Sequence, residues 1–192
     1  MKNLKYIFSA LAILMYQQKS SGQETFLSKS SLIDKHRTTA QSTTAETCKK
    51  LAQATSARCI ERDKNSKVEA RLNPVIVSNN QLFYKVIIDN RSNISFDLDF
   101  VRFYIRDIET TKRTVTQERE IRPVNAYGSD KRTVNAKTSS VFVFAFEKFT
   151  LSDNKTFFIE IYEKGGGRNL LLKVKKGDIV RAKGFSTTDH EI

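Results

Sequence analysis

Apolar and polar residues alternate along most of the chain between residues 73 and 176, in the pattern that β-strands produce. Polar turns such as "NRSN", "YGSDKR", "LSDN" and "GGG" separate the apolar runs. Several short strands at this spacing, without helical segments between them, indicate an antiparallel sandwich or barrel. The predicted strands are "NPVIVS", "QLFYKVIID", "FDLDFVRFYIRD", "RTVTQEREI", "SSVFVFAFEKF", "TFFIEIYEK" and "NLLLKVKK". We therefore expect a mainly β protein, an antiparallel β-sandwich.

Local patterns suggest how some of these strands are placed. Asn79 and Asn80, between the first two strands, are a turn-forming pair that predicts a hairpin. The run "VFVFAF" (141–146) is apolar at every position, which is typical of a central strand covered on both faces. The last two strands alternate, so each should have one face in solvent.

The strand "FDLDFVRFYIRD" (96–107) changes the phase of its alternation in mid-run. Because successive strand residues point to opposite faces, a slip of one residue predicts a bulge or a passage between sheets. If the second phase, with Val101, Phe103 and Ile105, points inward, then a row of three residues points outward. This row is Arg102, Tyr104 and Arg106, our candidate interface, since Arg and Tyr are enriched at binding hot spots. A solvated sheet face is the alternative.

The segment before the strands, "TTAETCKKLAQATSARCIERDK", has helical spacing. Thr43 and Glu46 have the spacing of a capping box, and small or apolar residues recur at three- and four-residue steps. We expect a helix over residues 45–63. Cys48 and Cys59 would then lie about 16 Å apart, beyond the limit of about 7 Å for bridged α-carbons, so they should not pair with each other.

The first 22 residues have the layout of a secretory signal peptide. Lys2 and Lys5 precede an apolar run of 11 residues, Tyr6–Tyr16, which is too short to span a bilayer as a helix, since about 20 residues are needed. Residues 23–44 are rich in Ser, Thr, Gln and Lys and read as a flexible linker. A β domain is expected over residues 72–183 and a tail over 184–192. The signal peptide predicts an exported protein of the periplasm, and association with the outer membrane is left open.

The chain offers little catalytic chemistry. Its two histidines, His36 and His190, lie in polar segments near the two ends. Asp97 and Asp99 lie two apart on one strand, where solvated acids are common, and Gly165–Gly167 precede an arginine and a strand, as in a hairpin turn. We expect no enzyme activity, no catalytic residues, no metal, no cofactor and no small-molecule substrate.

The formal net charge of +12 is concentrated toward the C-terminus. Between Lys164 and Lys183 there are seven Lys or Arg residues against the single acid Asp178. Such a patch suits phosphates of nucleic acid, anionic lipid or an acidic protein. The candidate basic patch consists of Arg168, Lys173, Lys175, Lys176, Arg181 and Lys183.

Several long motifs in one order resemble the C-terminal part of the TraN family encoded by Bacteroides-type conjugative transposons. They are "NRSNI", "DFVRFYIRD", "KRTVTQEREIRPV", "FAFEKFTLSDNK" and "EKGGGRNLLLKV", and together they cover about Leu72 to Lys183. Typical members carry a further β domain upstream, where this chain has only the linker and one helix, so it resembles a shortened member.

The resemblance implies a non-catalytic structural subunit of a mating-pair apparatus, similar to the β-sandwich subunits of type IV secretion systems. Its partners would be other subunits of that apparatus, and a ring oligomer is consistent with such a role. Two alternatives stay open, namely a basic periplasmic module with weak nucleic-acid contact and a truncated free periplasmic β protein. Most aromatic residues lie on inward phases of strands, which argues against a stacking platform for single strands.

Overall fold

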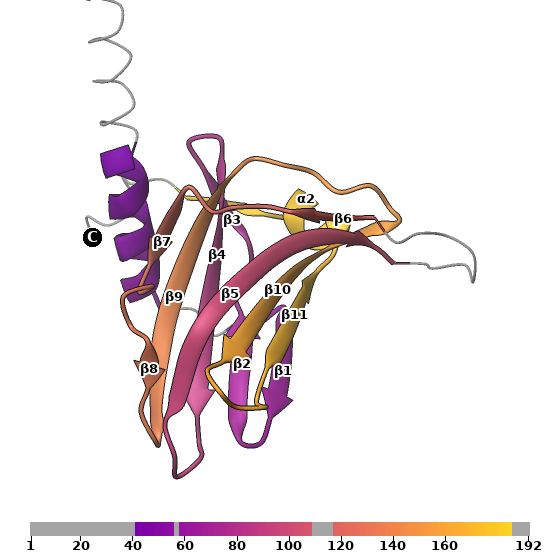
Figure 1. Ribbon diagram of the computed structural model, residues 1–192. Helices are drawn as coiled ribbons and strands as arrows, with labels where there is room; N and C mark the ends of the chain where they lie inside the picture. The colour runs from indigo at the N-terminus through magenta and orange to yellow at the C-terminus, as the bar shows by residue number, and fades with distance from the viewer. Residues whose placement is uncertain (1–40, 56–57, 109–116, 186–192) are drawn as a thin grey trace, which may run out of the picture. The chain divides into compact units, whose positions relative to one another are not determined.

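The computed structural model describes residues 41–55, 58–108 and 117–185 (Figure 1). From Thr44 onward the described residues form one compact unit. In this unit two β-sheets enclose a common core, and a helix packs on the outer face of the larger sheet. The prediction of a mainly β, antiparallel fold preceded by a short helix is thereby confirmed. The predicted signal peptide, most of the predicted linker and residues 186–192 lie outside the described residues.

The larger sheet has seven strands. Its long strand β4 (Gln81–Asn90) pairs over its whole length with β9 (Thr138–Glu147), and β9 pairs in turn with β7 (Asn125–Tyr127). The other edge of β4 pairs first with β3 (Ile76–Ser78) and then with β2 (Val68–Leu72). The outer strands are β1 (Glu61–Asn65), antiparallel to β2, and β12 (Lys183–Gly184), parallel to β3.

The smaller sheet has five strands. Its order is β11 (Leu170–Val174), β10 (Lys155–Glu163), β5 (Phe96–Asp107) and β6 (Glu118–Glu120), and β8 (Thr133–Val134) pairs with the beginning of β5. The short helix α2 (Lys176–Val180) connects β11 to β12, so the chain passes here from the smaller sheet to the larger one.

The hydrophobic core lies between the two sheets. Alternate residues of β4, among them Tyr84 and Val86, meet Phe103 and Ile105 of β5 there. Strand β9 is covered on both faces, as its uninterrupted apolar run predicts. Its phenylalanines, including Phe144, enter the core, while the residues between them face the helix. Each fully buried aromatic contributes about 1.5–3 kcal/mol relative to an exposed one, so these rings hold the sheets together.

The helix, at residues 41–53, is shorter at its end than the predicted 45–63 and includes residues 41–44 of the predicted linker. Cys48 and Leu51 pack against Phe83 of β4. The Nζ atom of Lys85 donates hydrogen bonds to the carbonyl oxygens of Leu51, Ala52 and Ala54, at 2.6–3.0 Å. Because these contacts satisfy carbonyls that a helix end leaves unpaired, Lys85 marks the end of the helix.

The last three residues of the predicted helix, 61–63, belong instead to β1 (Glu61–Asn65), so the β domain starts before Leu72. Strands β1 and β2 form a hairpin through Ser66 and Lys67, whose φ angles are 47° and 68°. The Asp63 side chain accepts a hydrogen bond of 2.7 Å from the backbone nitrogen of Leu171 in β11. Pairing with β2 and this contact override the local helical spacing. Both cysteines are free, and Cys59 lies outside the helix, with Sγ donating to the Glu61 carbonyl oxygen at 3.0 Å.

The hairpin predicted at Asn79–Asn80 is confirmed between β3 and β4. These asparagines have φ angles of 48° and 59°, a left-handed conformation that asparagine tolerates better than most residues. In the predicted strand "RTVTQEREI", the structure shows β6 at Glu118–Glu120, and residues 113–116 lie outside the described part.

The change of phase in β5 is confirmed as a bulge. Val101 pairs with Ile161 of β10, but two residues further along β10, Glu163 pairs with Leu98, three residues back along β5. The extra residue turns Phe100 outward, while Leu98 on one side and Phe103 on the other both enter the core.

Within the described residues, no helix is long and apolar enough to cross a membrane.

Candidate interaction surface

The outer face of the smaller sheet carries arginine, aromatic and glutamate side chains in a regular lattice. We call it the arginine–aromatic face. Strand pairing places Arg102 beside Glu160 and Tyr104 beside Phe158, and on the other side of β5 it places Tyr104 beside Glu120. The members of the face are Phe100, Arg102, Tyr104, Arg106, Glu118, Glu120, Phe158, Glu160 and Tyr162.

Tyr104 points outward but is covered, which corrects the expectation of an exposed row of three residues. Its ring stacks on Phe158 with centroids 5.1 Å apart, and the Arg102 and Arg106 guanidinium carbons lie 4.7 and 5.7 Å from its centroid. Only 3% of Tyr104 is exposed. The sequence pattern predicted correctly that Tyr104 lies on the outer face of the strand. The ring is nevertheless covered, because the arginine side chains on both sides can bury their stems and guanidinium planes on an aromatic surface.

Acidic residues balance the arginines on this face. Arg102 forms an ion pair with Glu118 of β6. The ion pair of Lys155 with Asp107, Nζ to Oδ1 at 2.9 Å, lies at the end of the same sheet but on its core-facing phase. Burial, with the charge of Glu160, raises the pKa of Tyr104 above its ordinary value. The Tyr104 hydroxyl therefore stays protonated at neutral pH, which suits hydrogen bonding rather than acid–base chemistry.

The exposed aromatic surface of the face lies at the bulge rather than at Tyr104. Phe100 is 48% exposed, and its ring stacks on Tyr162 with centroids 4.4 Å apart. A stacked pair of partly exposed aromatic rings beside arginines has the composition of a protein–protein hot spot. Sequence reasoning missed this pair because it treated Phe100 as the last inward residue of the first phase. The change of phase at this point of the sequence could have predicted that Phe100 points outward.

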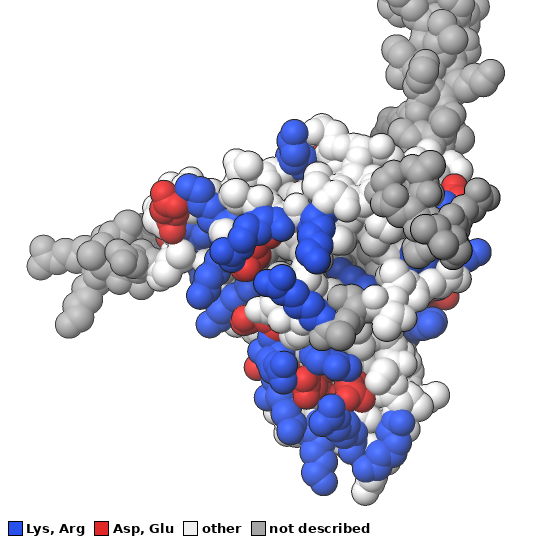
Figure 2. Space-filling view, turned by 180° about the vertical axis from the view of Figure 1, so that it is seen from behind, with Lys and Arg blue, Asp and Glu red and all other residues white. Residues whose placement is uncertain are grey.

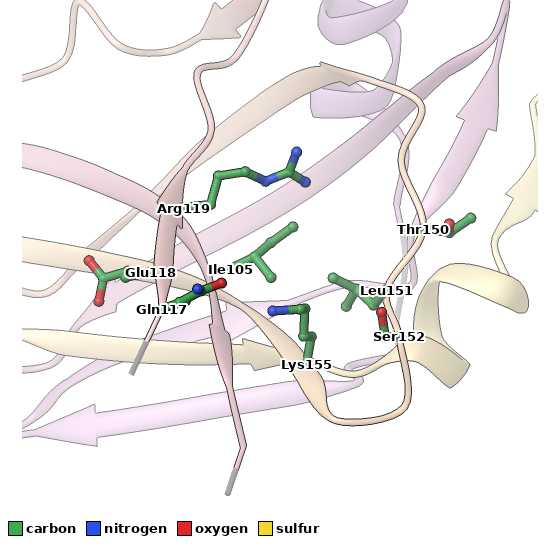
Figure 3. Close-up of a pocket in the computed structure, with 8 residues that line it drawn as sticks. All are labelled: Ile105, Gln117, Glu118, Arg119, Thr150, Leu151, Ser152 and Lys155. Carbon is green, nitrogen blue, oxygen red and sulfur yellow. The ribbon is translucent and has the colours of Figure 1, made fainter. Parts of the chain in front are cut away.

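A cavity of about 430 Å³ lies next to the end of the smaller sheet, on the core-facing side of β5 and β6 (Figure 3). Its lining comes from β5, from β6 with Gln117, from the segment 150–152 and from Lys155. In Figure 3, Arg119 and Lys155 extend toward the cavity, whereas Glu118 points away from them. Its charged lining residues are Arg119, Lys155 and Glu118, and Lys155 is already paired with Asp107.

Arg168 does not belong to an exposed basic patch, contrary to the sequence-based expectation. Its Nε donates to Glu163 Oε1 at 2.8 Å, its Nη1 donates to Ser92 Oγ at 3.1 Å, and its Nη2 donates to the Ser95 carbonyl oxygen at 2.6 Å. The guanidinium also lies over the Phe96 ring, 5.5 Å from the centroid. Hydrogen bonds from Arg168 hold the pKa of Glu163 below its ordinary value. Arg168 is therefore a structural cation, one that fixes the β10–β11 hairpin to the β4–β5 loop.

This contact joins two of the motifs that carry the resemblance, "NRSNI" and "GGR". Asn90 is fully buried, and its Nδ2 donates to the carbonyl oxygens of Ile94 and Val134 at 2.9 and 3.0 Å. Ser92 Oγ donates to Asn90 Oδ1 at 2.6 Å and accepts from Arg168. The motif residues form one buried polar network. Its hydrogen bonds replace those that the polar groups lose to water on folding.

The other basic-patch residues are divided between the two sheets. Lys173 lies on β11 beside Phe158, while Lys183 lies on β12 of the larger sheet. Two of the others have acidic neighbours, since Lys176 pairs with Asp153 at 2.8 Å and Arg181 lies 3.7 Å from Asp178. Arg168 is thus enclosed, whereas Lys175 is an exposed lysine next to α2.

A second basic cluster, missed from the sequence, lies on the larger sheet. On one face of the β1–β2 hairpin, Arg62 lies opposite Arg71 on the neighbouring strand, and Lys64 lies opposite Glu69. Arg91 joins them through ion pairs with Glu69 and Asp89, at 3.9 and 2.8 Å. Seen from behind, the molecule shows lysines and arginines over much of its surface with acids between them (Figure 2). The two-residue spacing of Arg62 and Lys64 is typical of one face of a strand, but the helical spacing of the preceding residues predicted a helix here.

The other residues that the sequence analysis considered for catalysis or phosphate binding lie in hydrogen bonds or turns of the fold, where the structure describes them. Asp97 Oδ1 accepts a hydrogen bond of 2.8 Å from Thr133 Oγ1, and the backbone oxygen of Asp99 accepts one of 3.0 Å from Arg132. Gly165–Gly167 form the turn between β10 and β11, where Gly165 has a φ of 62°. His36 and His190 lie outside the described residues. No group of three or more His, Cys, Asp or Glu side chains within the described ranges is arranged to hold a metal ion.

Fold and surface together define a small β-sandwich that presents an arginine–aromatic face and is held together by a buried polar network. A family model described as "Domain of unknown function (DUF4138)" matches residues 41–184. The chain therefore belongs to the DUF4138 family. No curated protein and no solved structure gives a significant match.

Proposed function

We propose that this protein is a non-catalytic structural subunit of a conjugative transfer apparatus, acting through protein–protein contacts in the bacterial envelope. The proposal includes export to the periplasm and contact with other subunits of the apparatus, and it takes the chain as a TraN-type member of its family. The motifs that resemble TraN support it, because two of them meet in the buried network around Arg168 and so belong to the architecture of the fold.

One observation carries the proposal. The arginine–aromatic face is exposed at Phe100 and at Arg102, whose side chain is 37% exposed, while helix 41–53 packs on the other sheet. Aromatic and arginine side chains are enriched at protein–protein interfaces and among binding hot spots, so such a face is suited to a protein partner. The ion pair of Arg102 with Glu118 adds charged groups of both signs for complementarity.

Gene deletion and complementation test the proposal. In a host carrying the conjugative element, deletion should abolish or strongly reduce DNA transfer, and the wild-type gene should restore it. The double variant Phe100→Asp, Tyr162→Ser should restore transfer at least tenfold less well, with less co-purification of other subunits. Because Phe100 is exposed and Tyr162 only partly buried, the variant should stay folded, at a cost of about 1–2 kcal/mol. Lys164→Glu, at an exposed position in the β10–β11 turn, is the matched control. Undiminished transfer after deletion would favour a free periplasmic β protein.

The cluster of Arg62, Lys64, Arg71 and Arg91 supports a second candidate function, contact with nucleic acid. Glu69 and Asp89 neutralise part of this charge, so binding should be weak, insensitive to sequence and steeply weakened by salt. Fluorescence anisotropy with labelled single-stranded DNA measures this. Tight binding at physiological salt that depends on base sequence would place the nucleic-acid function first.

A further inference from the structure

A second cavity lies far from the arginine–aromatic face in the fold, on the outer side of the larger sheet. It is enclosed by the end of helix 41–53, by strands β3 and β4, and by the residues around β12. Its volume is about 200 Å³. Leu51, Ile76, Phe83 and Phe185 supply apolar walls. A cavity of roughly 150 Å³ suffices for a benzene-sized group, so this one accommodates a single compact apolar group.

Asn73 lines this cavity and carries a donor without an acceptor. The residue is 5% exposed, and its backbone nitrogen donates to the Lys85 carbonyl oxygen at 3.0 Å, which fixes its position between β2 and β3. Its Nδ2, in contrast, makes no hydrogen bond with any described residue. Buried amides are nearly always hydrogen-bonded, because an unsatisfied one loses its water without compensation. An acceptor brought by a ligand would satisfy it.

The charged residues that line the cavity, within the described part of the chain, are basic. They are Arg58, Lys85 and Lys183. Lys85 is engaged with the carbonyl oxygens at the end of the helix. Arg58 and Lys183 are exposed, and they also line a smaller neighbouring cavity of about 90 Å³ together with Arg181 and Asp178. The side chains of Arg58 and Lys183 are thus available at the mouth.

We propose that this cavity binds a carboxylate that carries one compact apolar group. The apolar group would occupy the space beside Phe83, and the carboxylate would pair with Arg58 and Lys183. The Asn73 side chain, which lines the cavity but whose Nδ2 is enclosed, would turn to donate to the carboxylate. The same chemistry occurs in a small free acid and in the C-terminal residue of a peptide chain. This inference goes beyond the proposed function and does not depend on it, and no such ligand was expected from the sequence.

The test uses the full chain and 3-phenylpropionate as the probe, and binding is measured by NMR of the Asn73 side-chain amide. Saturable shifts of the Asn73 signals are expected, and the uncharged analogue 3-phenylpropanamide should bind at least tenfold more weakly. Parallel titrations with Gly-Gly-Phe, with a free and with an amidated C-terminus, distinguish the two sources. Preference for the free tripeptide over the small acid would assign the site to a chain terminus.

Two kinds of variant make the test specific. Arg58→Glu with Lys183→Glu changes exposed residues, so it should weaken probe binding at least tenfold and leave the fold intact. Lys164→Glu carries a charge reversal of the same kind outside the cavity and should leave binding unchanged. Filling the space with Ala54→Phe should abolish it. The proposal is overturned if the Asn73 signals show no saturable shift, or if the neutral amide binds as well as the acid.

Discussion

Single residues explain why the motifs of this chain hold the fold together. The Arg168 and Glu163 side chains are only 12% and 8% exposed, and Arg168 also bonds to Ser92 and Ser95. Removing one partner of a buried ion pair leaves the other charge without compensation, which typically costs 3–5 kcal/mol. We expect Arg168→Met to lower the free energy of unfolding by about 3 kcal/mol in urea titrations. Lys164→Met, four residues away and exposed, should change it by less than about 0.5 kcal/mol.

The same ion pair predicts a dependence of stability on pH. The pKa of Glu163 is lower in the folded chain than its ordinary value of 4.5, chiefly through hydrogen bonding to Arg168. The unfolded chain therefore binds the proton more readily, so the contribution is fully present above the ordinary pKa and is lost as pH falls through the folded pKa. Unfolding measured from pH 7 to well below pH 4.5 should show this loss beginning near pH 4.5 and growing below it, and Glu163→Gln should show a smaller loss. Parallel curves for the two proteins would contradict this role of Glu163.

At the scale of elements, β5 shows what the sequence pattern can and cannot predict. The change of phase predicted a bulge, and the strand has one between Leu98 and Val101. The pattern also predicted which side chains point outward, but not that Tyr104 would be covered. Alternation encodes the face of a strand, whereas burial on that face depends on neighbours from β10 and on the fold of arginine side chains.

The covered tyrosine gives a prediction for this strand. Tyr104→Ser should destabilise the protein by about 3 kcal/mol, because it removes a buried ring from between Phe158 and two guanidinium groups. Arg102→Ser should cost less than about 1 kcal/mol, since its ion pair is partly exposed. Thermal unfolding followed by circular dichroism compares the two variants. Equal small effects would show that the ring is in solvent and that the outward row is exposed along its whole length.

At the scale of the whole molecule, sequence reasoning predicted the fold class but only part of the surface. Alternating runs fix β-strands and their inward faces, so the sandwich and the doubly covered strand β9 were predictable. The β1–β2 hairpin was not, because the segment before it has helical spacing and its strand pairing is set by β4 and β11. The placement of the basic-patch residues could not be predicted for a related reason. Residues close in sequence between Lys164 and Lys183 end on two different sheets, and one of them, Arg168, is enclosed.

The arginine–aromatic face is the central claim at this scale, because it is where the proposed subunit would meet its neighbours. In-cell photo-crosslinking tests it most directly. A photoreactive phenylalanine analogue replaces Phe100, and a matched protein carries the analogue at the exposed Lys131. Our account predicts cross-links from position 100 to other subunits of the transfer apparatus, well above those from position 131. Position 100 giving no cross-link to those subunits, in cells that transfer DNA normally, would contradict it.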